Sequence, residues 1–261
     1  MTSPLHLAVL GDPIDHSRSP AIHTAALRHL GIQGSYEARR AGPVELADAI
    51  AEMYEGALHG LNVTMPLKRE ARAAAALLTD EASASGSVNT LRLRDGVVEG
   101  HSTDVVATRL AFSDPRFDPA APVLILGAGG ASAAVLAGAA GREVYLAARD
   151  SRLAEHLAEL SRTPASVIPF GAAVIGALLV NATPLGMNGE SLPDAITSVA
   201  TGIIDLAYGD KPTPTVTSAE HSGLALMDGV EFLVLQAAGS FEWWTGVQAP
   251  FGVMLEAARK R

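Results

Sequence analysis

The sequence contains no cysteine, which excludes disulfide bonds, iron–sulfur clusters, thiolate zinc sites and cysteine nucleophiles. Basic residues are also few, since 19 Lys and Arg stand against 28 Asp and Glu and give a formal net charge of −9. We therefore expect neither a general nucleic-acid binder nor a protein that coats anionic membranes. A local basic patch that holds a phosphate stays compatible with this composition.

Signals for export or membrane insertion are missing as well. The first ten residues have no basic start and include Pro4 and His6, which is unlike a signal peptide. Two long uncharged stretches, 119–141 and 163–189, contain central glycines or several prolines, which favours buried α/β segments over lipid-facing helices. Together with the absence of cysteine, these features favour a cytoplasmic location.

The remaining composition suits a folded α/β protein. With 48% hydrophobic and 18% charged residues over 261 positions, the chain can bury one large core or two smaller ones. Strand-like and helix-like patterns alternate along it. We predict strands at residues 5–10, 58–64, 90–93, 97–99, 123–126, 143–148, 178–181, 203–206 and 224–227. We predict helices at 19–30, 43–53, 67–78, 105–112, directly after 127–130, and from 230 to 261 with a break near 248–250.

Local signals set several boundaries. Ser19 is expected to cap the first helix, with Pro20 in its first turn. Asp95-Gly96 predicts a tight hairpin between two strands. The loop at 113–122 contains three prolines and is the best candidate for a domain boundary. In the second half, strand-like runs recur at the spacing that is typical of a doubly wound parallel sheet. We therefore expect a two-domain α/β protein.

A glycine-rich segment, Gly127-Ala128-Gly129-Gly130-Ala131-Ser132, follows a predicted strand and opens a predicted helix. Glycines there permit a tight turn and a close approach of a pyrophosphate to the helix N-terminus. This context predicts dinucleotide binding by a Rossmann-type domain. A purely structural glycine turn is the alternative.

The end of the next strand indicates which dinucleotide binds. An acidic residue there suits the free ribose of NAD, whereas arginine suits the 2′-phosphate of NADP. The chain has Arg149 and Arg152, which favour NADP, but Asp150 lies between them. NADP is therefore the predicted cofactor, and NAD stays open.

Taken in order, the motifs of the chain resemble those of the shikimate dehydrogenase family. They are His-Ser-Arg-Ser-Pro at 16–20, Asn-Val-Thr-Met-Pro-Leu-Lys at 62–68, Val-Asn-Thr at 88–90, Ser-Thr-Asp at 102–104, the glycine segment, Asn-Ala-Thr-Pro-Leu-Gly-Met at 181–187, Asp-Leu-Ala-Tyr at 205–208 and Gln-Ala-Ala at 236–238. The chain departs from the family pattern at Ser102, where Asn is usual, at Ala107, where a Gly commonly stands nearby, and at Ala148, where Asn is usual.

The resemblance implies NADP-linked interconversion of shikimate and 3-dehydroshikimate, a step of aromatic amino acid biosynthesis. It also implies a substrate-binding domain at 1–104, joined by C-terminal helices at about 236–261, and an NADP-binding Rossmann domain at 105–235, with the active site in the cleft between them. The implied catalytic pair is Lys68 and Asp104. The implied substrate-binding residues are Ser17, Ser19, Thr64, Asn89, Tyr208 and Gln236. The predicted cofactor-binding residues are Gly127, Ala128, Gly129, Gly130, Ala131, Arg149, Arg152, Asn181, Thr183, Met187 and Gly229.

The residue types fit these roles. Reduction of a ketone places negative charge on its oxygen, and a positioned acid must protonate it. Lys68 suits this task because a buried amine can be tuned toward neutrality, whereas arginine stays charged. Only three of the 19 basic residues are lysines, Lys68, Lys211 and Lys260, so a titratable amine at 68 stands out. Ser17 and Ser19, two apart at a helix start, can surround one anion.

Two other functions stay open at this point. One is a quinate or aminoshikimate dehydrogenase that uses NAD, suggested by Ser102 and Asp150. The other is a catalytically silent dinucleotide sensor, which the presence of both Lys68 and Asp104 disfavours. The histidines are too scattered to predict a metal site. We expect a small-molecule substrate and a monomer or homodimer.

Overall fold

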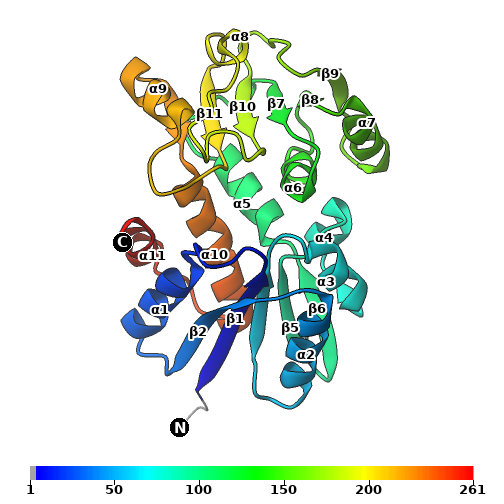
Figure 1. The fold of residues 1–261 in the computed structure, drawn as a ribbon, viewed down its shortest axis with the longest axis vertical. Coiled ribbons are helices and arrows are strands. Elements are labelled where there is room, and N and C mark those ends of the chain that lie inside the picture. The colour runs from blue at the N-terminus through cyan, green and yellow to red at the C-terminus, as the bar shows by residue number, and fades with distance from the viewer. Residues whose placement is uncertain (1–3, 261) are drawn as a thin grey trace. The chain divides into compact units, whose positions relative to one another are not determined.

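The computed structural model describes residues 4–260 and divides into two compact units (Figure 1). Unit 1 comprises Met1–Thr103 and Val234–Arg261, and unit 2 comprises Asp104–Leu233. The outermost residues of the expected first domain, 1–3 and 261, lie outside the described residues. Unit 1 is thus built from two separate stretches of sequence, whereas unit 2 is continuous.

Unit 1 contains a six-stranded sheet in the order β2-β1-β3-β5-β6-β4. Its strands are β1 Leu5–Gly11, β2 Gly34–Arg40, β3 Gly60–Val63, β4 Leu77–Leu78, β5 Thr90–Arg94 and β6 Val97–His101. β1 runs parallel to both of its neighbours, and β5 runs antiparallel to β3 and β6. The β5–β6 hairpin turns at Asp95 and Gly96, both with positive φ, 51° and 74°, which confirms the predicted tight turn.

Helices cover this sheet. They are α1 Ser19–His29, α2 Pro43–Tyr54, α3 Lys68–Ala74, α4 Asp80–Ser85, α11 Phe251–Arg259 and most of α10 Gly229–Thr245. α2 begins where the Glu45 carboxylate accepts a hydrogen bond from the Gly42 amide, and it buries Leu46 and Met53 in the core. α11 packs against α1, where the Arg18 guanidinium donates to the Ala258 carbonyl at 2.8 Å.

Some sequence predictions for unit 1 are wrong in detail. The helix expected at 67–78 ends at Ala74, because Ala75 adopts an extended conformation and Leu77–Leu78 joins the sheet beside β6. The predicted cap is also displaced by one residue. Arg18 occupies the N-cap position of α1, and the Ser19 amide instead donates to the Ser17 hydroxyl at 3.3 Å. The sequence analysis did not identify β2 or α4, whose patterns are short or mostly polar.

Unit 2 contains a fully parallel six-stranded sheet in the order β12-β11-β10-β7-β8-β9. The strands are β7 Val123–Leu126, β8 Val144–Ala148, β9 Ser166–Pro169, β10 Leu178–Asn181, β11 Gly202–Asp205 and β12 Ala225–Met227. The helices are α5 Thr103–Phe112, α6 Gly130–Gly138, α7 Ser151–Leu160, α8 Asp194–Thr197 and α9 Pro214–Ser222, followed by the start of α10. β7 and β10 are buried along their whole length, as expected for central strands of a parallel sheet.

This strand order is the doubly wound order of dinucleotide-binding domains, which confirms the fold class predicted from the sequence. The order of the strands reverses between β7 and β10, so their carboxyl ends meet at the point where such sheets bind ligands. The segments that follow β7 and β10 are therefore the ones placed to form a site in unit 2. Within residues 4–260, no helix is long and apolar enough to cross a membrane.

Candidate active site

The centre of the candidate site in unit 1 is the buried amide of Asn89. Its Nδ2 donates to Thr103 Oγ1 at 2.9 Å and to Gln236 Oε1 at 3.1 Å. Its Oδ1 accepts from the Thr103 amide at 2.8 Å and from the Thr90 hydroxyl at 3.1 Å. The structure thus brings two predicted substrate-binding residues, Asn89 and Gln236, into direct contact from sequence positions 147 apart.

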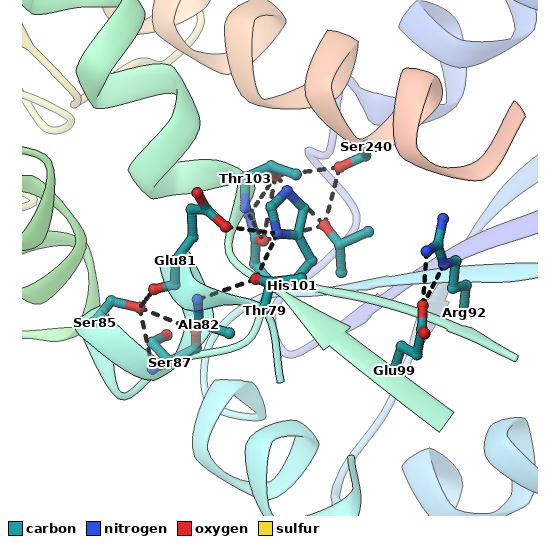
Figure 2. A network of polar contacts seen from close by, with 12 residues as sticks. Thr79, Glu81, Ala82, Ser85, Ser87, Arg92, Glu99, His101, Thr103 and Ser240 are labelled. Atoms are coloured by element: carbon teal, nitrogen blue, oxygen red, sulfur yellow. Dashed lines mark hydrogen bonds and ion pairs between the residues drawn. The ribbon is translucent and has the colours of Figure 1, made fainter. Parts of the chain in front are cut away.

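Four polar residues around this amide were not among the predicted site residues: Asn62, Thr90, Thr103 and Ser240. Asn62 Nδ2, on β3, lies 3.0 Å from Thr90 Oγ1 and 3.0 Å from Ser240 Oγ. The Ser240 hydroxyl, one turn after Gln236 on α10, lies 3.2 Å from Thr103 Oγ1, a contact visible in Figure 2. Asn62 and Thr103 belong to motifs quoted from the sequence, and Ser240 follows Gln236 by four residues on one helix face, so these were the available signals.

The two predicted anion-binding serines lie at the start of α1, half-buried. Ser17 Oγ accepts a hydrogen bond from the Ser19 amide, which orders the turn between them. The Ser19 side chain bonds to the hydroxyl of Tyr36, on β2, and that hydroxyl donates to Asn62 Oδ1 at 2.8 Å. Ser19 is therefore connected through Tyr36 and Asn62 to the Asn89 centre.

Thr64 and Lys68 lie on the segment between β3 and α3. The Thr64 amide donates to the Leu10 carbonyl and its own carbonyl accepts from the Leu67 amide, both at 2.8 Å. A Cβ on Gly11 would lie 2.3 Å from the Thr64 methyl, so glycine at 11 makes room for this side chain. Lys68 is the first residue of α3, half-buried, and its carbonyl accepts from the Val88 amide next to Asn89.

A buried histidine lies beside this centre. His101, at the end of β6, has its Nδ1 2.8 Å from Thr79 Oγ1 and 3.8 Å from the Glu81 carboxylate (Figure 2). Its ring stacks on Trp243 of α10 at 5.1 Å between centroids. Burial lowers the pKa of His101, and Glu81 opposes this shift. His101 thus serves to join β6 to α4 and α10.

In unit 2 the glycine segment links β7 to α6. Gly127 has φ +110°, and a Cβ there would lie within about 3 Å of Ser132 Oγ and the Ala182 carbonyl oxygen, so only glycine fits. Gly129 is the N-cap of α6, no side chain caps that end, and a Cβ on Gly129 would meet nothing within 4 Å. The start of α6 therefore lacks a side-chain cap and has open space beside Gly129, which suits an anion.

The segment after β10 is the second one that lies where the strand order reverses, and it is built around Asn181. Its Nδ2 donates to the Leu185 carbonyl and to Asp205 Oδ1, and its Oδ1 accepts from the Thr183 amide and hydroxyl. Every polar atom of the Asn181 amide is thus engaged within the protein. Asn181 holds Thr183 next to Gly127, where the Thr183 methyl is 3.1 Å from the position a Cβ would take.

Asp205 anchors the same segment from β11. Its carboxylate accepts from Asn181, from the Thr213 hydroxyl at 2.6 Å and from the Ala207 amide at 3.1 Å. Burial raises the pKa of Asp205, and these hydrogen bonds oppose that shift. The motif at 205–208 is therefore a structural support for the loop that carries Tyr208.

Arg149, Asp150 and Arg152 follow β8 and are exposed. Asp150 is the N-cap of α7, and its carboxylate accepts from the Arg152 amide at 3.0 Å. The Arg152 guanidinium lies 4.0 Å from the same carboxylate and is 91% exposed. The acidic residue that left NAD open is thus occupied in starting a helix, while both guanidinium groups face solvent.

The remaining predicted residues also lie in unit 2. Asp104, buried, is its first residue and directly follows Thr103; its carbonyl accepts from the Thr108 hydroxyl at 2.8 Å. A Cβ on Gly229 would lie 2.6 Å from the Ala207 carbonyl oxygen, so α10 begins in close contact with the segment before Tyr208. Met187 is 52% exposed on the loop after β10.

The structure therefore groups the predicted residues into two sets. In unit 1, Asn89 and Gln236 touch, Ser17 and Ser19 join the same network, and Lys68 adjoins it through the backbone. In unit 2, the glycine segment and Thr183 meet at the switch point, and Gly229 lies beside the Tyr208 loop. Lys68 and Asp104 belong to different units. No group of three or more His, Asp or Glu side chains among residues 4–260 is placed to hold a metal ion.

Models of known protein families match both an N-terminal and a C-terminal part of the chain. Residues 9–91 match the model of the shikimate dehydrogenase substrate binding domain, and residues 229–259 match that of the shikimate 5′-dehydrogenase C-terminal domain. The chain is 38% identical to the shikimate dehydrogenase (NADP(+)) of an Anaeromyxobacter species over 95% of its length and 94% of that protein. It is 36% identical to the enzyme of the same name from Thermus thermophilus, over 98% of both chains.

Solved structures give the same result. The crystal structure of shikimate 5-dehydrogenase from Thermus thermophilus in complex with NADP(H) and shikimate is similar, with a TM-score of 0.89, 35% identity and 98% coverage of both chains. The shikimate 5-dehydrogenase from Listeria monocytogenes, in complex with shikimate and NAD, is similar at a TM-score of 0.85 and 27% identity, over 98% of this chain and 96% of that one.

Proposed function

This chain belongs to the shikimate dehydrogenase family, and on that premise we propose that it catalyses the reversible NADPH-dependent reduction of 3-dehydroshikimate to shikimate. The observation that carries the proposal is the near-complete likeness to a structure described as binding NADP(H) and shikimate. The reaction belongs to aromatic amino acid biosynthesis, and we place the enzyme in the cytoplasm as a monomer or homodimer.

The substrate half of the proposal rests on unit 1. Ser17 and Ser19 bind the carboxylate at the start of α1, where hydroxyls and backbone amides converge. Asn89 and Gln236 bind ring hydroxyls from the centre of the polar network. Thr64, on the segment after β3, and Tyr208, on the loop that Asp205 supports, are the further residues that we propose to contact the substrate. The packed network holds these groups before substrate arrives, which lowers the entropy cost of binding.

Lys68 and Asp104 are the proposed proton-transfer pair. Lys68 Nζ gives a proton to the ketone oxygen during reduction and takes it back during oxidation. The Asp104 carboxylate orients that amine and accepts a hydrogen bond from a substrate hydroxyl. Both groups are held by the ends of helices, Lys68 at the start of α3 and Asp104 in the first turn of α5, which restricts their motion.

The residues of unit 2 fit NADP. Gly127 permits the tight turn after β7, Gly129 leaves open space where a Cβ would stand, and the uncapped start of α6 offers amides to a pyrophosphate. Ala128, Gly130 and Ala131 are small and keep that approach free. Arg149 and Arg152 follow β8, where they can bind a 2′-phosphate. When bound, NADP supplies the hydride.

NADP is preferred over NAD because the Asp150 carboxylate is already the N-cap of α7. The residue that would accept bonds from a free ribose is therefore engaged elsewhere. Quinate and aminoshikimate dehydrogenation and a silent sensor are disfavoured, since the curated relatives that match most of the chain carry the name shikimate dehydrogenase (NADP(+)).

The direct test offers purified protein shikimate or quinate, each with NADP or NAD, and follows reduced nicotinamide by absorbance. We expect the highest kcat/KM with shikimate and NADP. Turnover with quinate and NAD alone contradicts both the substrate and the cofactor assignment. No turnover with any pair contradicts the enzymatic function itself.

The catalytic pair has its own test. We expect Lys68→Ala and Asp104→Asn each to lower kcat by about 10²–10⁴-fold, the usual contribution of general acid–base catalysis. Lys260→Ala is the matched control, because that amine pairs with Glu256 on the exposed surface of α11. Near-normal kcat in both site variants, with bound NADP retained, would remove Lys68 and Asp104 from the mechanism.

A further inference from the structure

Tyr36 is a buried residue that the sequence analysis and the proposed function leave without a role. It lies on β2, is 6% exposed, and packs in a cluster with Leu7, Val9 and Ile14. Burial raises the pKa of its phenol, so the group stays a neutral hydroxyl. A hydroxyl in an apolar cluster is costly unless it forms hydrogen bonds. Tyr36 forms two, and both lead into the candidate site.

The first bond leads to the substrate-binding amides. The Tyr36 hydroxyl donates to Asn62 Oδ1 at 2.8 Å. Asn62 in turn donates to the Asn89 carbonyl at 3.1 Å and to the Thr90 and Ser240 hydroxyls at 3.0 Å. β1 lies between β2 and β3, so this bond passes over one whole strand.

The second bond leads to the proposed carboxylate-binding serine. The Ser19 side chain bonds to the Tyr36 oxygen and lowers the pKa of the phenol, opposing the larger effect of burial. Because the Tyr36 hydroxyl has one proton and donates it to Asn62 Oδ1, the Ser19 hydroxyl is the donor in this second bond. The single Tyr36 proton is then directed to Asn62, and the single Ser19 proton to Tyr36.

Aromatic side chains pack against the ring of Tyr36 and hold it in place. His23, on α1, stacks on it with centroids 4.2 Å apart and planes within 5°. His23 is fully buried, and neither of its ring nitrogens has a hydrogen-bond partner. Trp244, on α10, lies 5.5 Å from His23 and 6.4 Å from Tyr36 between ring centroids. The phenol therefore keeps one rotational freedom, that of its hydroxyl proton about the C–O bond.

We propose that Tyr36 is a positioning residue that lets Ser19 donate its proton to the substrate carboxylate, an inference that rests on the proposed function. A carboxylate accepts only, so Ser19 must turn its proton away from Tyr36 to bind it. The Ser19 oxygen then becomes an acceptor, and the Tyr36 hydroxyl donates to it by rotation. Tyr36 thereby polarises Ser19 toward the anion. Because the same proton otherwise goes to Asn62, carboxylate binding also changes the hydrogen bonding of Asn62 and the Asn89 centre.

The test compares Tyr36→Phe with Tyr54→Phe, a control whose parent side chain is 58% exposed on α2. We expect Tyr36→Phe to raise both the KM and the calorimetric Kd for shikimate by about tenfold, as for loss of a hydrogen bond in a charged network, with kcat within about twofold of wild type. Tyr54→Phe is expected to match the wild type. Thermal unfolding of each variant establishes that it is folded.

A double-mutant cycle with Ser19→Ala separates positioning from a general loss of structure. We expect Tyr36→Phe to have little further effect on Kd once Ser19 is alanine, because Tyr36 acts through that hydroxyl. Equal effects of Tyr36→Phe in both backgrounds, or an unchanged KM in the single variant, overturn the inference. A wild-type protein that neither binds nor oxidises shikimate instead contradicts the proposed function, so the two failures are distinct.

Discussion

His23 shows how a single buried side chain can set the acid limit of the protein. It lies inside an aromatic cluster of Tyr36, Phe241 and Trp244 with no hydrogen bond to either nitrogen. Burial lowers its pKa from the ordinary value of 6.5 to about 3. The folded protein therefore binds this proton far more weakly than the unfolded chain does.

The sign of the resulting pH dependence follows directly. Between about pH 6.5 and pH 3 the unfolded state carries a proton on His23 that the folded state lacks, so stability falls as the pH is lowered through this window. For His23→Phe we expect the loss of unfolding free energy between about pH 8 and pH 5 to shrink by about 2 kcal/mol. Urea titrations at both pH values measure this difference.

His29→Gln is the matched control, because His29 is exposed on the same helix. Its pH dependence of stability is expected to equal that of the wild type. If His23→Phe loses as much stability on acidification as the wild type, the buried histidine does not set the acid limit.

At the level of single elements, the start of α7 contains one residue that caps the helix and others that we expect to select NADP over NAD. Asp150 caps the helix through the Arg152 amide, whereas Arg149 and Arg152 have exposed side chains. We expect Asp150→Ala to lower the free energy of unfolding by about 1 kcal/mol, the usual cost of losing such a cap, and to leave the NADP-over-NAD preference in place. Arg149→Ala should do the reverse, keeping stability and raising KM for NADP more than for NAD.

Chemical denaturation and kinetics with both cofactors measure the two effects. Arg94→Ala, an exposed arginine at the β5–β6 turn of unit 1, is the control for loss of a surface guanidinium. A large gain of NAD-linked activity in Asp150→Ala would show that this carboxylate decides between the cofactors.

The elements that the sequence predicted well are those with strong local signals. The run at 178–181 is β10 with the same bounds, and Asp95-Gly96 forms the expected hairpin. The short strand at Leu77–Leu78 was mistaken for helix, because an alanine-rich stretch has high helix propensity and only pairing with β6 reveals its extended form. Tertiary contacts decided that segment, and no local pattern records them.

The candidate site was predictable only in part for the same reason. Motifs indicated Asn89 and Gln236, and the structure joins them. Tyr36 and Ser240 carry no motif of their own, and their roles depend on β2, β3 and α10 meeting at one place. The Asn181 amide was predicted to line the cofactor, but all of its polar atoms bind protein groups, which favours a supporting role.

At the scale of the whole molecule, the two units differ in how the chain builds them. Unit 2 is one continuous stretch with its own parallel sheet and core. We therefore expect a fragment of residues 104–233 to unfold cooperatively and to bind NADP. Calorimetry of the fragment, with and without NADP, measures both properties.

The matching fragment of residues 1–103 is expected to lack cooperative unfolding. Without α10 it loses buried Phe241, the Trp244 ring that packs against Gly60, and the Ser240 hydroxyl that bonds Thr90 and Thr103. Adding a peptide of residues 234–261 should restore a transition. A cooperative transition in the short fragment alone would mean that the C-terminal helices are dispensable for unit 1.

Because unit 1 consists of two stretches of sequence that flank unit 2, it also fixes the order in which the two units can fold during synthesis. The polar and aromatic residues of α10 are made after the whole of unit 2, yet they complete a layer that β1 begins. During translation unit 2 can fold while unit 1 is still incomplete, with its apolar face uncovered and accessible to chaperones. A nascent chain stalled before residue 234 would therefore contain a folded unit 2 attached to an incomplete unit 1.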